Sequence, residues 1–396
     1  MARNNIRRRV SPNGIERFEA IWRDASGKQR QQSFRTKEAA TKFQTERRAD
    51  VIRGLARDED KSRLAFRHYA DQLLADKATT LKPQTFHGVS AYMNRYVLPY
   101  FGDKPIGSIS SATCLAYLRH LTALPNRRKD VRGLTPATIR HAFVPVREVL
   151  ALAVQDGAVY SNPAVGIKLP TRTAAPKFES QPLEPQSVQA ISDAMDSRDP
   201  SGIDGLIVRF LANTGLRAAE LSGLQIGDID TAKRLVRVVR TWTRQFGTTD
   251  PKSAAGKRTV PLPAWLASEV QAYLRSHPRR SEPTAPVFPA RRMHATDFDW
   301  DSPIEMGTYR QRRLRPALAS ANLPVTVRVH DLRHSYGTML AEMGVPAERI
   351  MRLLGHSSID MALRYIKSKT ETFHDHVDLL PDPRAAAKPA RRLRAV

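Results

Sequence analysis

The sequence predicts a multidomain chain: a small α/β domain, an all-α domain, and a mainly α domain that carries a small β-hairpin sheet (α+β). Three observations predict this order. Polar and apolar residues alternate with period two near the N-terminus, and helical spacing follows from there to about residue 170. Five prolines between positions 163 and 185 then mark a linker, beyond which helical segments surround one pair of short strands. A length of 396 residues suits two or three such domains.

Residues 1–60 read as a three-stranded sheet with one helix. Residues 17–23 alternate, so that Phe18, Ala20 and Trp22 lie on one side, and a turn signal at residues 24–27 precedes a strand that ends at Phe34. Helical spacing begins after Thr36, which is a suitable N-cap. A small sheet with one helix and a basic rim could lie on DNA, although a solvated basic surface would have the same composition.

Residues 62–172 are expected to be all helical, after a short charged linker at 58–61. Four helices are predicted, and the last has Thr135 as N-cap and Pro136 in its first turn. The second helix is expected to stop at Pro99. The approximate ranges of the four predicted helices are 64–76, 83–98, 111–121 and 136–155.

Residues 183–380 form the third predicted domain. One hairpin is expected, from strands at 235–241 and 258–262. Helices are expected near 185–195, 202–214, 263–276, 307–321, 331–343, 346–354 and 358–368. The tail, residues 381–396, is rich in Ala, Pro and Arg, carries five basic residues against one acidic residue, and is predicted to be disordered.

The charge balance favours a polyanionic partner. Lys and Arg number 64 against 39 Asp and Glu, which gives a formal net charge of +25. Arginine outnumbers lysine 48 to 16, and its planar fork suits phosphate, although a genome of high GC content would give the same bias. The single cysteine, Cys114, excludes a disulfide framework and a Cys-rich metal site. No apolar run reaches about 18 residues, so we expect no membrane contact and a cytoplasmic protein.

Polar side chains stand beside apolar helical signals at six positions of the third domain. His330 and Arg333 are three residues apart and would share a helix face. Gly355 suits a helix end, and the pattern Ser357-x-x-Asp360 resembles a capping box that restarts a helix. The six positions are Arg217, Lys252, His330, Arg333, His356 and Tyr365.

At these positions the chain resembles the tyrosine recombinase (phage integrase) family. The matching strings are TGLRAAELSGL, PKSAAGKRTVPL, HDLRHSYGTML and LLGHSSIDMALRYIK, in that order. The spacings also fit: 35 residues from Arg217 to Lys252, 78 more to His330, 23 from Arg333 to His356, and nine to Tyr365. Residues 62–172 resemble the SAM-like helical domain that binds core sites in this family, and residues 1–60 resemble the arm-site-binding domain of the larger phage integrases.

The resemblance implies a site-specific DNA recombinase and assigns roles within residues 183–380, its catalytic domain. Arg217 and Arg333 would clamp the phosphate, and His356 would add a hydrogen bond. Tyr365 would be the nucleophile and would form a 3′-phosphotyrosyl link, so that no ATP is needed.

Two further residues would handle protons in the implied reaction. His330 would accept or orient the tyrosine proton, and Lys252 would protonate the leaving 5′ oxygen. Lys257 is the alternative to Lys252. Glu220 is expected to position Arg217.

No cofactor and no metal are expected. Charge on the phosphate can be stabilised by metal ions or by fixed donors, and no carboxylate cluster of metal-binding type is apparent in the sequence. His330 and His334 are four residues apart, but HDLRH lacks the glutamate of the zinc-protease motif. His334 and Asp331 remain outside the predicted catalytic set.

The implied function is integration and excision of a phage or related mobile element. The implied partners are double-stranded DNA at core and arm attachment sites, three further copies of the chain in a homotetramer on DNA, a host DNA-bending protein and an excisionase. The implied location is the cytoplasm and nucleoid of a bacterial host. The alternatives are a chromosome dimer resolvase, a catalytically inactive DNA-binding relative and a type IB topoisomerase.

Overall fold

A computed structural model describes residues 6–24, 26–52, 57–125, 133–171, 182–251, 253–292 and 297–366 of the chain. The chain divides into two compact units, Met1–Lys177 and Phe178–Val396. Both combine helices with small sheets, which gives a mixed, mainly helical architecture. Within the described residues, no helix has both the length and the apolar character needed to cross a membrane.

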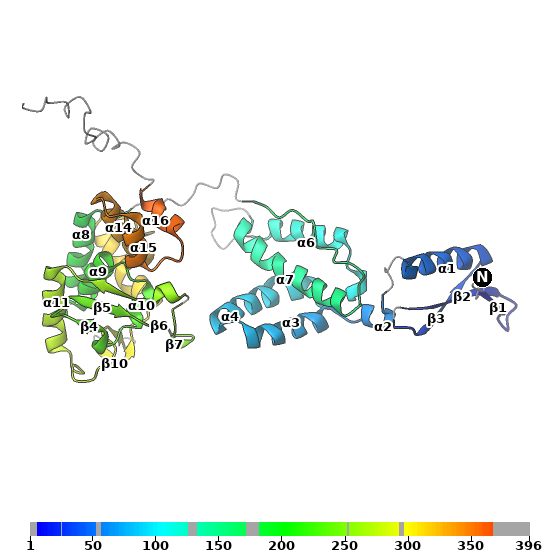
Figure 1. Cartoon of the computed structure of the whole chain (residues 1–396), viewed down its shortest axis with the longest axis horizontal. Helices are drawn as coiled ribbons and strands as arrows, with labels where there is room; N and C mark the ends of the chain where they lie inside the picture. Colours follow the sequence, from blue (N-terminus) through cyan, green and yellow to red (C-terminus); the bar gives the residue numbers. More distant parts are fainter. Residues whose placement is uncertain are drawn as a thin grey trace, which may run out of the picture. The chain divides into compact units, whose positions relative to one another are not determined.

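The first unit begins with an antiparallel sheet of order β1-β2-β3, formed by β1 (Ile6–Val10), β2 (Glu16–Arg23) and β3 (Gln29–Phe34). Helix α1 (Lys37–Ile52) packs along one face of this sheet (Figure 1). The Phe43 ring of α1 lies 5.0 Å from Trp22 and 5.1 Å from Phe34, so the alternating aromatic residues bury one face. Thr36 caps the helix, because its Oγ1 accepts the Ala39 N–H at 3.2 Å, as predicted.

Helices make up the rest of the first unit. The predicted linker at 58–61 contains one helical turn, because Asp58 accepts two backbone N–H groups and begins α2. Pro99 does not end the second helix, because it lies in the first turn of α5, where its missing N–H costs no hydrogen bond. The elements are α2 (Glu59–Ser62), α3 (Phe66–Thr80), α4 (Pro83–Tyr92), the π-helical turn η1 (Met93–Val97), α5 (Leu98–Phe101), the 3-10 turn η2 (Ile106–Ser108), α6 (Ser111–Ala123) and α7 (Pro136–Gln155).

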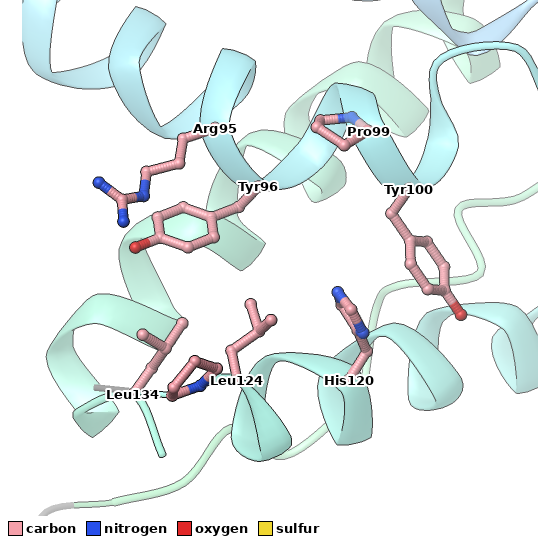
Figure 2. Close-up of a pocket in the computed structure, with 8 residues that line it drawn as sticks. Arg95, Tyr96, Pro99, Tyr100, His120, Leu124 and Leu134 are labelled. Atoms are coloured by element: carbon pink, nitrogen blue, oxygen red, sulfur yellow. The ribbon is translucent and has the colours of Figure 1, made fainter. Parts of the chain in front are cut away.

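A cavity of about 400 Å³ opens in this helical part of the first unit. Figure 2 shows its wall, in which the Arg95 guanidinium lies 5.3 Å from the Tyr96 ring centroid and the His120 ring lies 5.3 Å from Tyr100. None of the predicted site positions that the structure describes lines it. The lining residues are Arg95, Tyr96, Pro99, Tyr100, His120, Leu124, Pro125 and Leu134.

The first half of the second unit holds most of its strands. Strands β5 and β8 pair antiparallel, with Val236 opposite Val260, close to the predicted positions. The prediction of one hairpin was incomplete, because β4 also pairs with β5 to give a three-stranded sheet of order β4-β5-β8, and β6 and β7 form a separate two-stranded sheet. The elements are α8 (Pro185–Asp196), α9 (Ile203–Thr214), α10 (Ala218–Ser222), η3 (Ile226–Asp228), β4 (Ile229–Asp230), β5 (Leu235–Val238), β6 (Thr241–Thr243), β7 (Gly247–Thr249), η4 (Ala254–Gly256), β8 (Arg258–Pro261) and α11 (Ala264–Ser276).

The second half of this unit is mainly helical. It adds one more two-stranded sheet, β9 with β10, which the sequence did not predict. The elements are β9 (Pro289–Arg291), β10 (Phe298–Pro303), α12 (Met306–Tyr309), the π-helical turn η5 (Arg310–Leu314), α13 (Arg315–Ser320), α14 (Val329–Glu342), α15 (Ala347–Leu354) and α16 (Ile359–Ile366).

Helix α9 forms the centre of this unit's core. Its Ile207, Phe210 and Leu211 are fully buried in a cluster that includes residues from the β5–β8 sheet and from α11 and α14. Helices α14, α15 and α16 lie side by side (Figure 1) and share a smaller cluster around Ile350 and Leu354. This three-helix arrangement brings the ends of α14, α15 and α16 together, where most of the predicted site residues lie.

Candidate active site

Three arginines converge on the C-terminal end of α15. The Arg258 Nε donates to the Leu353 carbonyl at 2.7 Å, the Arg333 Nη2 donates to Leu354 at 2.6 Å, and the Arg217 Nη2 donates to Gly355 at 3.0 Å. The last carbonyls of a helix have no partner within the helix and carry its partial negative charge. They therefore hold guanidinium groups from β8, from α14 and from the start of α10 at one place.

Gly355 ends α15 in a left-handed conformation, with φ of 64°. The His356 N–H donates to the Met351 carbonyl at 3.0 Å and the Gly355 N–H donates to Arg352 at 3.2 Å, which is a Schellman motif. A Cβ on Gly355 would lie 2.8 Å from the Ala255 carbonyl oxygen, so the position has no room for a side chain. This turn places His356, which is 8 % exposed, directly beside the arginines.

Glu220 is a buried carboxylate that ties two of the arginines together. It accepts the Arg217 Nη1 at 2.7 Å and the Arg217 backbone N–H at 2.8 Å, which confirms the expected contact with Arg217. It also accepts both terminal nitrogens of Arg258, at 3.0 and 2.9 Å. Burial raises the pKa of Glu220, but the hydrogen bonds and charge of Arg258 outweigh burial and hold it below its usual value.

Arg333 is 2 % exposed and is held from two sides. Besides Leu354, it donates through Nη1 to the Gly215 carbonyl at 2.7 Å. Burial, with the nearby Arg217 charge, lowers the pKa of Arg333 to about 9. Its guanidinium remains protonated at neutral pH and so brings a buried positive charge into the site.

The Tyr365 hydroxyl lies 3.2 Å from the Nδ1 of His334. The proton acceptor expected from the sequence was His330, which lies one turn earlier on α14 and contacts the His334 ring edge-on, at 4.6 Å between centroids and 84°. The His356 ring lies nearly parallel to that of Tyr365, at 6.1 Å and 12°. The tyrosine hydroxyl therefore forms a hydrogen bond with His334, and His330 touches that histidine.

Both remaining histidines are held in the neutral form. Burial and the charges of Arg333 and Arg217 lower the pKa of His356 to about 4. His330 is solvent-exposed in the first turn of α14, where packing around its ring, followed by His334 and the Arg333 charge, lowers its pKa to about 4 as well. Near neutral pH, each can therefore donate one hydrogen bond and accept one.

The structure describes one of the two candidate lysines. Lys252 lies outside the described residues. The alternative, Lys257, is in the described part, and its Nζ forms an ion pair with Asp250 at 3.0 Å.

The start of α16 also differs from the prediction, because Ser358, and not Ser357, accepts the Asp360 N–H through its Oγ, at 3.1 Å.

Sequence reasoning missed Arg258 and set aside His334. Arg258 stands in the string PKSAAGKRTVPL, next to Lys257, but nothing in its spacing indicates that the side chain reaches α15. His334 stands four residues after His330, and this spacing places both on one face of α14. That pattern was a usable signal, although only the position of α16 reveals that His334 meets the tyrosine.

The arrangement suits chemistry on a phosphodiester. Fixed guanidinium and imidazole donors can stabilise the charge on nonbridging phosphate oxygens, and a tyrosine hydroxyl beside them can attack phosphorus. Fold and site together fit the class of enzymes that break and rejoin DNA strands through a tyrosine.

Comparison with known proteins leads to the same class. The model of the phage integrase family matches residues 181–372, and that of the phage integrase N-terminal SAM-like domain matches residues 65–122. The prophage phiRv2 integrase of Mycobacterium tuberculosis (strain CDC 1551 / Oshkosh) is 28% identical over 342 residues, covering 84% of this chain and 83% of that protein. Tyrosine recombinase XerC of Mycobacterium sp. (strain KMS) is 31% identical over 238 residues, covering 57% of this chain and 70% of that protein.

Two solved structures share the fold. The Tn1549 transposon integrase in complex with a circular intermediate DNA has a TM-score of 0.60 at 20% identity, covering 80% of this chain and 98% of that one. A lambda integrase tetramer bound to a Holliday junction has a TM-score of 0.55 at 15% identity, covering 90% and 96%. The chain belongs to the phage integrase family and is a site-specific tyrosine recombinase.

Proposed function

We propose that this recombinase integrates and excises a phage or related mobile element. The observation that carries the proposal is the meeting of Arg217, Arg333, His356 and Tyr365 around the end of α15. The similarity to a prophage integrase over 84% of the chain supports integration over the alternative function, chromosome dimer resolution.

Each site residue has a proposed role in the cleavage step. Arg217 and Arg333 bind the nonbridging oxygens, because each guanidinium has N–H groups beyond those that bind carbonyls. His356 binds the phosphate as well, and its buried Nδ1 has no hydrogen-bond partner within the described residues. Tyr365 attacks phosphorus and forms the 3′-phosphotyrosyl link, while Lys252, or alternatively Lys257, protonates the 5′ oxygen.

The phosphotyrosyl link conserves the energy of the broken bond, so rejoining needs no ATP. The fixed donors supply the charge stabilisation that a metal would otherwise give, so the reaction is proposed to be independent of metal and of any cofactor. His330 helps to orient the tyrosine proton in this scheme, which is one of the two roles that the resemblance implies for it.

The domain roles are also proposals. Residues 62–172 are the core-site-binding domain, 183–380 the catalytic domain, and 381–396 a basic tail. Residues 1–60 are the arm-site-binding domain, and one face of their sheet supports this. The face opposite α1 carries exposed basic and polar side chains: Arg7, Arg9, Arg17, Arg23, Gln29, Gln31 and Ser33. Such a surface suits phosphates and base edges.

The proposed assembly is a homotetramer on two DNA duplexes in the cytoplasm of a bacterial host, with a host DNA-bending protein and an excisionase as partners. The lambda integrase tetramer on a Holliday junction supports four copies, since it shares the fold. The net charge of +25 supports a DNA partner.

Covalent trapping tests the function. A supercoiled plasmid carrying the DNA that flanks the gene is incubated with the protein in EDTA, quenched in SDS and analysed with and without protease. We expect a protease-sensitive DNA adduct with the wild type and none with Tyr365→Phe, which should still bind DNA. An adduct that persists in Tyr365→Phe, or that requires a metal, would contradict the proposal.

Deletion of residues 1–60 separates the two recombinase functions. An integrase should lose recombination between attachment sites and keep cleavage of a core site. A chromosome dimer resolvase should keep both.

A further inference from the structure

The tyrosine hydroxyl has a specific partner that the roles above do not use. The Nδ1 of His334 lies 3.2 Å from the Tyr365 Oη, and the two ring centroids are 5.8 Å apart. We propose that His334 is a catalytic residue: it accepts the Tyr365 proton when the hydroxyl attacks the phosphate, and it returns that proton when the strand is rejoined. This inference rests on the proposed role of Tyr365 as nucleophile.

Ring geometry favours His334 over the other two histidines. The His356 ring is within 12° of parallel to the Tyr365 ring. The contact of His356 with Tyr365 is a ring contact with 6.1 Å between centroids, whereas His334 places its Nδ1 3.2 Å from the hydroxyl oxygen. His330 is solvent-exposed and contacts the His334 ring edge-on, at 4.6 Å between centroids. The histidine with a nitrogen placed at hydrogen-bond distance from the tyrosine oxygen is His334.

The backbone of α14 fixes the tyrosine against this histidine. Gly337 follows His334 by three residues and lies on the same face of α14. A Cβ at Gly337 would lie 2.8 Å from the Cζ of Tyr365 and 2.9 Å from both Cε atoms, so only a glycine lets the ring approach this closely. Gly337 and His334 together define where the hydroxyl rests.

The proton balance of the step is complete. His334 begins neutral, with its proton on Nε2, so that Nδ1 accepts the hydrogen bond from Tyr365. As the Oη–P bond forms and the P–O5′ bond breaks, the tyrosine proton moves to Nδ1 and a proton from the lysine moves to O5′. Rejoining reverses both transfers: the 5′ hydroxyl returns its proton to the lysine, and His334 returns its proton to the tyrosine oxygen.

Surrounding charges assist the transfer. Ionisable groups around His334 include His330 on its own helix, Tyr365 on α16 and His356 after α15. Arg333, also on α14, interacts with the Tyr365 oxygen, and its positive charge favours the phenolate.

A sulfur-substituted substrate separates the base from the acid. Two duplexes span the cut site mapped on the plasmid, one normal and one with sulfur in place of the bridging 5′ oxygen. Thiolate leaves without protonation, so this substrate removes the need for the lysine but not for a base. Single-turnover adduct formation is measured from pH 6 to 9 for His334→Ala, His334→Asn and Lys252→Ala, with Thr338→Ala as a control on the same helix.

We expect His334→Ala to lower the rate about 10²- to 10⁴-fold on both substrates, which is the usual contribution of a general base. His334→Asn keeps an acceptor oxygen near Nδ1 but cannot take up a proton, so its rate should be low and should rise about tenfold per pH unit. Lys252→Ala should recover on sulfur, and Thr338→Ala should match the wild type. Each variant is first shown to bind the duplex as tightly as Tyr365→Phe does.

Three results would overturn the inference: a wild-type rate in His334→Ala, recovery of His334→Ala on sulfur, or a wild-type rate and pH profile in His334→Asn. The last would show that His334 only holds the ring. If the wild type forms no adduct, or Tyr365→Phe forms one, the proposed function itself fails, and that result is distinct from the other three.

Discussion

Replacing Glu220 by alanine should unfold the second unit at a markedly lower denaturant concentration. The carboxylate is 1 % exposed and accepts four hydrogen bonds, two from Arg217 and two from Arg258. Its removal leaves the Arg258 guanidinium, which is 6 % exposed, without its counter-charge. Breaking a buried ion pair from one side costs about 3–5 kcal/mol, so we expect a loss of that size in the free energy of unfolding.

Denaturation of the full chain by urea, followed by tryptophan fluorescence, measures this loss. Three of the four tryptophans (Trp242, Trp265 and Trp300) lie in the second unit and report on it. The matched control is Glu282→Ala, which removes an ion pair with Arg279 at the surface, and we expect a much smaller effect from it. Equal losses from the two variants would refute the reasoning, because burial would then make no difference to the value of the carboxylate.

The same carboxylate predicts a pH dependence. Because the pKa of Glu220 is lowered in the folded state, its contribution is fully present above the usual value of 4.5. It is lost as the pH falls through the folded-state pKa. Glu220→Gln should therefore lose less stability than the wild type on acidification below pH 4.5. If the free energies of unfolding of the two proteins fall in parallel below pH 4.5, the prediction is wrong.

Three further predictions concern the helix end, a histidine and the N-terminal sheet. Gly355→Ala should destabilise the protein by about 1–3 kcal/mol, because of its φ of 64° and the 2.8 Å approach to the Ala255 oxygen, whereas Gly88→Ala, with open space around it, should be neutral or stabilising in thermal unfolding. The His356 imidazole should titrate near pH 4 by NMR, so stability should fall as the pH drops from 6.5 towards 4; a midpoint near 6.5 would contradict its burial beside the arginines. If the exposed Arg17 contacts a phosphate, Arg17→Ala should reduce the slope of log K against log salt by about 0.9 in titrations with duplex DNA, and an unchanged slope would exclude that contact.

Much of the fold was predictable because local signals are strong in this chain. Thr135 and Pro136 mark the start of α7 in the sequence, and the Thr135 side chain caps it as expected. Pro99 misled the prediction, because a proline ends a helix only where its missing N–H breaks a bond. The π-helical turn η1 directly before α5 shifts the hydrogen-bond register, so Pro99, in the first turn of α5, falls where no partner is needed.

The candidate site was predictable in its residues but not in its connections. Three of the four strings identify Arg217, Arg333, His356 and Tyr365, and the described structure brings these four together. The spacing along α14 shows that His330 and His334 share a face, yet which of them meets Tyr365 depends on how α16 packs. Arg258 was not predicted for a similar reason, because its partners are a buried carboxylate and a carbonyl 95 residues away in the sequence.

The acceptors at the end of α15 are main-chain oxygens, which has a consequence for how this protein can change over time. The residues at 353 and 354 can be substituted without loss of a hydrogen-bond acceptor, since every residue type has the same backbone carbonyl. Variation there is limited by packing alone, whereas each arginine, and the glycine that ends the helix, has no equivalent substitute. Active relatives of this protein should therefore keep the three arginines, while the residue types at 353 and 354 vary. In a relative that has lost its activity, substitutions should appear first at the arginines.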